Sequence, residues 1–409
     1  MRISTSQVFN QGLQELQRIN TDQARTQKQV ATGKKILNPS DDPVASTRIT
    51  QLKQQLAQGD QFVRNAELSK TRLERQDGVL SGFTESLARA RELTIRAGDG
   101  ALSKTDRESV ATELRQVLDQ MVSLANTRDA QGEYIFGGFR GEEAPFQKDI
   151  SGNIEYRGDE GQRSVEIDND VFVPVNDNGK QTFGAIPSDR PTFSTSANPR
   201  NEADPPARIS TGVVTDRETF EEFYPDDLVV RFEKDGAGNT TYSVSNRDTG
   251  RVLVEDEPYT SGSPIQVEGV RFEVSGNPAD GDSFFVETSQ TQSVFGTMEK
   301  LIAGLETHPD NEAGRTALKD TVDQALANID NAETRVLEVQ SGVGTRLNTV
   351  ESTVEFLKDS ELLSRETLSD LEDLDYAEAI SRLTQQNFVL QAAQQSFAQI
   401  SRLSLFDSL

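Results

Sequence analysis

A seven-residue repeat near the carboxyl end constrains the fold of this chain more than any other feature. Its two series, three residues apart, are Tyr376, Leu383, Leu390 and Phe397, and Ala379, Gln386, Ala393 and Ile400. Alternating spacings of three and four residues place side chains along one stripe of an α-helix, which is the pattern of a coiled coil. The amino end repeats the spacing, with an amide-rich middle, at Phe9, Leu13, Leu16, Asn20, Gln23, Gln27 and Val30. We therefore predict that the chain begins and ends in coiled-coil helices.

Helical periodicity extends inward from both ends. The helices that we predict cover Thr5–Thr32, Val44–Gly98, a segment after Ser103 that ends near Thr127, Asn311–Asp359 and Ser369–Leu405. From Gly132 to about Thr291 the pattern changes to short alternating segments separated by glycines, which is typical of β-strands. Pro187–Pro206 is rich in Pro, Ser, Asn and Asp and predicts a long loop. The fold class that follows is α+β: a bundle of long helices formed by both termini, with an inserted, mainly-β domain.

The stretch "NPSDDP", residues 38–43, separates the first two helices. Pro39 disfavours helical backbone at Asn38. Asp41 or Asp42 can cap the following helix, and Pro43 suits its first position, where a backbone N–H is not needed. Two adjacent carboxylates argue against a phosphate site here, and the stretch offers too few further ligands for a metal. We interpret it as a helix break with a restart.

Composition excludes most catalytic chemistry. The chain has no cysteine, which rules out disulfides and thiolate sites, and His308 is its single histidine. We expect His308, in the turn-like "THPDNEAG", to be a solvated loop residue. No P-loop, dinucleotide fingerprint, HExxH or GxSxG motif is present. We expect no enzymatic activity, no cofactor and no metal.

Two acidic stretches could suggest cation sites. "DGAGN", Asp235–Asn239, joins two predicted strands and lacks the alternating ligands of a calcium loop, so we interpret it as a hairpin turn. "SDLEDLDYAEA", residues 369–379, suits the start of a helix, where the dipole favours acidic residues.

The formal net charge is −25, which argues against nucleic-acid binding. The charge is uneven: residues 1–139 carry a net +2, residues 140–287 carry −16 and residues 288–409 carry −11. This difference favours pairing of the two ends. No apolar run approaches the roughly 20 residues of a membrane span. The start, "MRISTSQVFNQGLQELQ", lacks the apolar core of a cleaved signal peptide. What remains is association, because amphipathic helices of this kind can pack into rings or tubes.

Several stretches in the right order resemble the bacterial flagellin family. They include "VATGKKILNPSDDPVAS", "ARELTIRAGDG", "GVGTRLNTVES" and "DLEDLDYAEAISRLTQQNFVLQAAQQSFAQISRLSLFDSL". The resemblance covers about residues 1–140 and 290–409. It implies terminal helices 1–40 and 370–409 that pack into an inner tube, a long-helix rod domain of residues 41–140 and 290–369, and a β-rich outer domain of residues 141–289.

The sequence "YIFGG", residues 134–138, and the ending resemble the junction branch of that family more than filament flagellin. The resemblance implies a structural, extracellular subunit that forms a ring and connects the flagellar hook to the filament. The implied partners are further copies of the chain, a neighbouring hook-associated protein, flagellin and an export chaperone. We expect the loop residues Asn38, Asp41, Asp42 and Pro43 to contact neighbouring subunits. Two alternatives remain open: a filament-forming flagellin, and a secreted adhesin or enzyme whose activity lies in the β domain.

Overall fold

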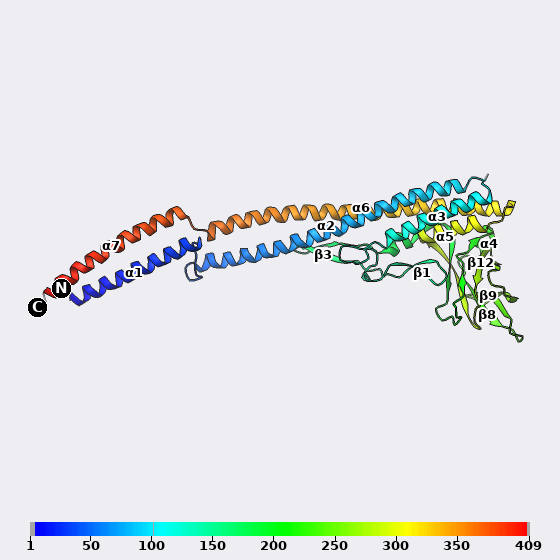
Figure 1. Cartoon of the computed structure of the whole chain (residues 1–409), viewed down its shortest axis with the longest axis horizontal. Helices are drawn as coiled ribbons and strands as arrows, with labels where there is room; N and C mark the ends of the chain where they lie inside the picture. The colour runs from blue at the N-terminus through cyan, green and yellow to red at the C-terminus, as the bar shows by residue number, and fades with distance from the viewer. Residues whose placement is uncertain (1–4, 101, 407–409) are drawn as a thin grey trace. The chain divides into compact units, whose positions relative to one another are not determined.

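The computed structural model describes residues 5–100 and 102–406, and the chain forms two compact units (Figure 1). Unit 1 combines the residues up to 65 with those from 352 onward, and unit 2 is residues 66–351. The α-helices of the described residues are α1 Thr5–Thr32, α2 Pro43–Ala97, α3 Lys104–Ala125, α4 Arg217–Phe223, α5 Val294–Thr307, α6 Glu312–Glu372 and α7 Tyr376–Phe406. In the described ranges, none of these helices combines the length and the apolar character needed to cross a membrane.

The predicted amino-terminal helices are confirmed. α1 has the predicted bounds, α2 is displaced by one residue, and α3 ends two residues early. The start of α3 is a capping box, because the side chain of Ser103 accepts from the backbone N–H of Asp106 while the Asp106 carboxylate accepts from that of Ser103. The start of α3 thus lies where the sequence supplies a capping residue.

The predicted break between Asp359 and Ser369 is wrong, since α6 continues to Glu372. The residues in between contain neither glycine nor proline, so nothing in the backbone ends the helix there. The chain turns at residues 373–375 instead. Asp375 then caps α7 by accepting from the backbone N–H groups of Ala377 and Glu378.

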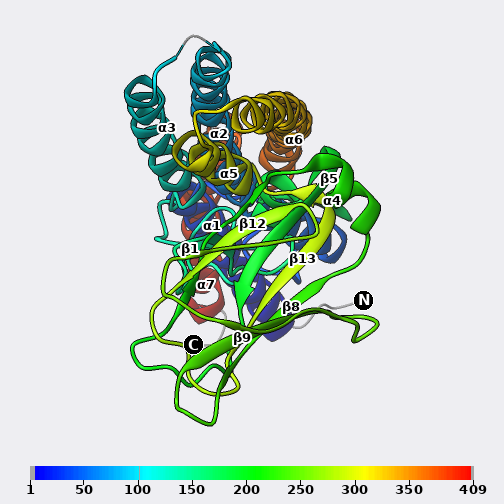
Figure 2. The ribbon, with the colours of Figure 1, turned by 90° about the vertical axis from the view of Figure 1, so that its right-hand side faces the viewer.

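In unit 2, the buried side chains of α2 and α6 follow the spacing of a coiled coil. On α2 they are Ala66, Ser69, Leu73, Gln76, Leu80, Phe83, Leu87, Ala90, Thr94 and Ala97; on α6 they include Val322, Ile329, Val336, Val343 and Val350. The two helices run antiparallel, because polar contacts pair Lys70 with Glu351 at 2.6 Å and Arg91 with Asp330 at 2.8 Å. Figure 2 shows α3 and α5 lying beside them. The predicted long-helix packing is therefore present within this unit.

The strands of unit 2 form two larger antiparallel sheets and two hairpins. The bounds are β1 Phe146–Lys148, β2 Ile154–Tyr156, β3 Ser164–Asp168, β4 Val171–Pro174, β5 Ile186–Ala197, β6 Arg208–Ile209, β7 Val213–Val214, β8 Leu228–Lys234, β9 Thr240–Asn246, β10 Val252–Pro258, β11 Pro264–Val267, β12 Val270–Ser275 and β13 Ser283–Gln292. One sheet has the order β10-β9-β8-β13-β5, and the other has β11-β12-β6 with β7 also paired to β12. A shared core of buried side chains, including Phe193, Phe232, Phe272 and Phe284, lies between them. The inserted β domain is thus confirmed.

The hairpin at Asp235 is also confirmed. β8 and β9 pair up to Lys234 and Thr240, on either side of the "DGAGN" turn. The carboxylate of Asp235 accepts from the backbone N–H groups of Ala237 and Asn239, each at 2.8 Å. The Asp235 carboxylate therefore stabilises the turn by accepting these hydrogen bonds.

The loop predicted for Pro187–Pro206 is wrong in its first part, which forms strand β5. The loop was predicted from the Pro, Ser, Asn and Asp content of the stretch, and β5 contains two of its prolines, Pro187 and Pro191. β5 is an edge strand that pairs only with β13, and the ladder shifts register between Ser289 and Thr291, opposite these prolines. A missing backbone N–H is tolerated at such places.

The expectation for His308 is wrong as well. Its side chain is only 4% exposed, and its Nε2 lies 3.4 Å from the hydroxyl of Thr321 on α6. His308 follows α5 directly, and the turn folds it inward between α5 and α6. Burial, together with the charges of Arg271 and Arg107, lowers its pKa to about 4. The imidazole is therefore neutral at pH 7.

Candidate assembly surface

Unit 1 contains the α1–α7 pair, which joins the two ends of the chain side by side (Figure 1). The pairing is antiparallel. Gln23 Nε2 donates to Asn387 Oδ1 at 2.6 Å. Earlier in α1, Gly12 packs against the Phe397 ring, which would lie 3.0 Å from a Cβ added to this glycine. Just after α1, Gly33 packs against Tyr376 at the start of α7, whose hydroxyl would lie 2.9 Å from an added Cβ.

The seam of α7 lies where the heptad spacing places it. Ala379 is 1% exposed. The partly buried side chains that continue the stripe are Leu383, Gln386, Leu390, Ala393 and Phe397. Tyr376 is 51% exposed and lies against Gly33 at the end of the pair. The side chain of Ile400 lies outside the described residues.

The seam of α1 agrees with the predicted spacing in alternate positions only. Leu16, Gln23 and Val30 are partly buried, as expected, whereas Leu13, Asn20 and Gln27 are exposed. The other inward positions each lie one residue earlier, at Gly12, Ile19 and Thr26. Gly12 has no side chain and so admits the Phe397 ring, a role that an apolar pattern does not reveal. The side chain of Phe9 lies outside the described residues.

The "NPSDDP" corner starts α2 as predicted. The Asp42 carboxylate accepts from the backbone N–H of Ala45 at 2.9 Å, and Pro43 is the first helical residue. An N-cap carboxylate satisfies one of the donors that the first turn leaves open, and proline there removes another. Of the two candidates, Asp42 is the cap.

Asp41 holds the loop before the cap. Its Oδ2 accepts from the backbone N–H groups of Leu37 and Asn38, each at 3.1 Å, and its Oδ1 lies 3.0 Å from the guanidinium of Arg25 on α1. The backbone hydrogen bond from Asn38, followed by that from Leu37 and the charge of Arg25, lowers the pKa of Asp41. This carboxylate therefore links α1 to the corner.

A second link ties the corner to the end of α6. The Glu372 carboxylate binds the ammonium groups of Lys34 and Lys53, the latter at 2.8 Å. Burial alone would raise the pKa of Glu372, but the hydrogen bonds from Lys34 and Lys53 outweigh it, so its pKa lies below the usual value. Backbone hydrogen bonds from Lys35 to Glu372 and from Leu374 to Gly33 complete the link. Of the acidic stretch 369–379, Glu372 thus pairs with lysines and Asp375 caps α7.

A groove of about 430 Å³ lies beside the corner. Its lining includes Arg25, Lys35, Asp41, Asp42, Arg382 and Gln386. Side chains of both signs of charge line it. In the described part of the chain, no group of three or more His, Cys, Asp or Glu side chains has the geometry to hold a metal ion.

Unit 1 also exposes many large apolar side chains. They are Leu13, Val44, Phe356, Leu362, Leu363, Tyr376, Ile380, Phe388 and Val389. Phe388 is 73% exposed and Leu362 69%. Ile380 and Phe388 lie off the heptad seam, so the seam did not reveal them; large apolar residues at the remaining positions of α7 are the signal that could have. Unit 2 exposes side chains of this kind as well, among them Phe139 and Phe172, but they are spread over more than twice as many residues. Apolar groups gathered on one surface are typical of a site that another protein covers.

Comparisons with known proteins agree with this arrangement. Residues 3–140 match the bacterial flagellin N-terminal helical region, and residues 326–409 match the bacterial flagellin C-terminal helical region. Flagellar hook-associated protein 3 of Escherichia coli K12 is 25% identical over 407 residues, 99% of each chain. The crystal structure of flagellar hook-associated protein 3 from Legionella pneumophila is 33% identical, with a TM-score of 0.53, covering 79% of this chain and 98% of that one. A flagellin of Listeria monocytogenes is 23% identical over only 31% of this chain.

The chain therefore belongs to the bacterial flagellin family. The hook-associated proteins of Escherichia coli and Legionella pneumophila match this chain over nearly their whole length, whereas the Listeria flagellin matches 31% of this chain and 44% of its own length. Within the family, this chain is a structural subunit of the hook–filament junction.

Proposed function

We propose that unit 1 is the surface through which copies of this subunit assemble into a ring and join the neighbouring parts of the flagellum. In this arrangement residues 1–40 and 370–409 form the inner tube, residues 41–140 and 290–369 form the rod, and residues 141–289 face outward. The role is structural and includes no catalytic step or cofactor.

The observation that carries this proposal is the distribution of uncovered apolar side chains. Unit 1 is the smaller unit, yet it holds nine of the sixteen large apolar side chains that are exposed among the described residues, including Phe356, Leu362 and Phe388, although its helices already pack against each other. Leaving such side chains in water forgoes roughly 1.5–3 kcal/mol for each that could be fully buried. A neighbouring subunit supplies the missing cover.

Charge supports the same arrangement. The slightly basic residues 1–139 and the acidic residues 288–409 attract each other between copies as well as within one chain. Attraction of this kind speeds encounter and favours one register of contact over others. We propose that Asn38, Asp41, Asp42 and Pro43 contact the neighbouring subunit beside the charged groove.

The proposed partners follow from the position in the flagellum. The other hook-associated protein lies on the hook side, and flagellin lies on the filament side. Before assembly, an export chaperone binds α7 and covers its apolar face. The subunit reaches the cell exterior through flagellar export.

A deletion strain tests the proposal. It should build hooks, lack attached filaments and release flagellin into the medium, and the intact gene should restore filaments. Normal filament attachment in the deletion strain would contradict the proposed function. Long filaments formed on seeding the purified protein would instead indicate a filament flagellin.

The corner is tested separately by complementation with Asp41→Ala and Asp42→Ala. Each should lower the fraction of subunits incorporated into hooks, because the loop that meets the neighbour loses its support. Wild-type incorporation of both variants would remove the corner from the assembly surface.

A further inference from the structure

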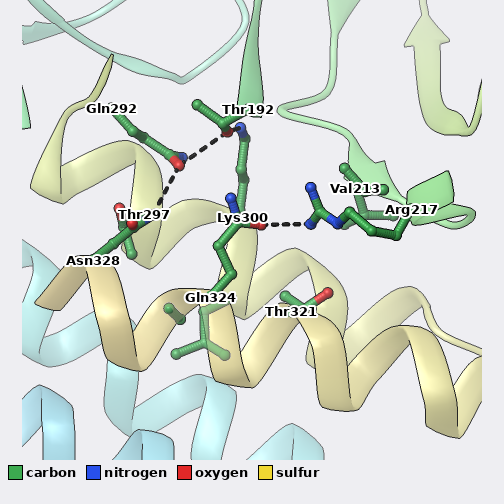
Figure 3. A pocket seen from close by; sticks show the side chains of 12 residues that line it. Thr192, Val213, Arg217, Gln292, Thr297, Lys300, Thr321, Gln324 and Asn328 are labelled. Carbon is green, nitrogen blue, oxygen red and sulfur yellow. Dashed lines mark hydrogen bonds between the residues drawn. The ribbon is translucent and has the colours of Figure 1, made fainter. Parts of the chain in front are cut away.

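A small polar cavity lies inside unit 2, where strands β5 and β13 meet helices α4, α5 and α6 (Figure 3). Its volume is about 20 Å³. The polar side chains around it include Thr192, Arg217, Gln292, Lys300, Gln324 and Asn328. A cavity needs roughly 10–15 Å³ to hold one water-sized particle. The space therefore suits a single small ligand.

Two cations line this cavity with neutral partners. The ammonium of Lys300 donates to the hydroxyl of Thr192 and the carbonyl of Phe193, and it lies 4.4 Å from the centre of the Phe193 ring. Within the described part of the chain, no carboxylate lies within 4 Å of this ammonium. Burial and, to a smaller extent, the charge of Arg217 lower the pKa of Lys300 to about 7, while the charge of Glu299 partly opposes this shift. The protonated lysine is thus short of negative charge.

Arg217 is in a similar position. Its side chain is 12% exposed, and its terminal nitrogens donate to the carbonyl of Pro191 at 3.1 Å and to Gln324 Oε1 at 2.6 Å. Its one carboxylate contact among the described residues is Glu221, at 4.0 Å. Asp320 contributes only at longer range, and Arg190 repels it.

Two buried donors make no hydrogen bond within the described part of the chain, although one of them, Arg217 Nε, faces Glu221 Oε1 at 4.0 Å. The Nε of Arg217 and the Nε2 of Gln292 have no hydrogen-bond partner among the described residues. The amide of Gln292 is held in this orientation, because its Oε1 accepts from the hydroxyl of Thr192 at 3.0 Å and from Asn328 Nδ2 at 3.4 Å. A buried donor without a partner costs roughly 1–3 kcal/mol.

The cavity therefore supplies positive charge and free donors, and what it lacks is an acceptor with negative charge. We propose that it binds one monovalent anion of halide size, chloride in particular, between Arg217, Gln292 and Lys300. The anion accepts from the free Nε2 of Gln292 and is attracted by the charges of Lys300 and Arg217, which line the same cavity. It also connects β13, α4 and α5, and so fastens the sheet to the helices inside unit 2.

Bromide provides the direct test on the full-length protein. Crystals grown in bromide should show an anomalous peak in this cavity, within hydrogen-bonding reach of Gln292 Nε2. In solution, replacing gluconate, which is too large for the cavity, by chloride at constant ionic strength should raise the unfolding midpoint of unit 2. Each tenfold rise in chloride above the dissociation constant should add roughly 2–5 °C.

Three variants make the test specific. Lys300→Met keeps the length of the side chain and should abolish the chloride effect, whereas Lys180→Met, at an exposed lysine paired with Glu160, should retain it. Gln292→Glu places a carboxylate at the cavity, so it should keep the protein folded in gluconate and remove the chloride response even if Lys300→Met fails to fold. A density peak that scatters as water, or equal midpoints in chloride and gluconate for the parent protein, would overturn the proposal.

Discussion

The outer face of α7 offers the sharpest test of how this subunit assembles. Ile380, Phe388 and Val389 are 52%, 73% and 42% exposed. Full burial of such side chains contributes roughly 1.5–3 kcal/mol each, so a neighbour that covers the exposed fractions gains about 2.5–5 kcal/mol from the three. Replacing all three by alanine should therefore weaken association by roughly 10²- to 10⁴-fold.

The isolated subunit should not lose stability from the same change. Alanine has a higher helix propensity than isoleucine, phenylalanine or valine, and the replaced side chains contribute little to packing within one chain. The assay compares the fraction of subunits incorporated into purified hooks with thermal unfolding of the monomer. A matched control replaces exposed polar residues of the same helix, namely Ser381, Gln385 and Gln391. The control should incorporate normally.

The seam of α7 provides the contrasting result. Replacing Leu383, Leu390 and Phe397 by alanine should loosen the α1–α7 pair already in the monomer, because these side chains pack within one chain. The outer-face variant should fail only at incorporation. If it incorporates like the parent protein, or if its monomer is destabilised as much as the seam variant, the division of α7 into an inner and an outer face is wrong.

Three further outcomes follow from single positions. Gly33→Ala should destabilise unit 1 by roughly 1–2 kcal/mol, because φ is +71° at this residue. Gly59→Ala should stabilise unit 1 by roughly 0.5–1 kcal/mol, because Gly59 lies within helix α2 and a Cβ added there would meet no atom within 4 Å. Denaturant unfolding measures both changes in the free energy of unfolding, and changes of the same sign would contradict the argument. The pKa of Glu372 is lower in the folded than in the unfolded protein, so the ionised carboxylate stabilises the fold at pH values above its unfolded pKa near 4.5. This stabilisation is lost as the pH falls through the folded pKa, so stability should fall less steeply on acidification in Glu372→Gln than in the parent protein. His308 has a folded pKa of about 4 against 6.5, so stability should fall by about 3 kcal/mol as the pH drops between these values, and a His308→Gln variant with the same pH profile as the parent would refute this.

Sequence periodicity predicted the helices well, because the residues of each helix themselves set the spacing of its buried positions. The heptad positions of α7 became its seam, and Ser103 and Asp42 became caps, since each of these depends on neighbours within one turn. The phase of α1 was only half predicted, because Gly12 is inward only through the presence of Phe397.

The missed features depend on residues that are distant in the sequence. The prolines of β5 are tolerated only because β5 lies at a sheet edge, which no local pattern reveals. The cavity beside Lys300 requires Thr192, 108 residues away, to meet α5. The inward position of His308 likewise requires Thr321 of the following helix.

The antiparallel pairing of α1 with α7 bears on when a subunit becomes competent to assemble. The hydrogen bond between Gln23 and Asn387 joins residues 364 positions apart, whereas the sheets of unit 2 are complete in sequence by residue 292. Contacts of such separation form late, because a long loop must close first. A chain interrupted before α7 can fold its sheets but leaves α1 without its partner. Truncated chains should therefore not be incorporated, since only a chain that has been synthesised through α7 can form the α1–α7 pair of the assembly surface.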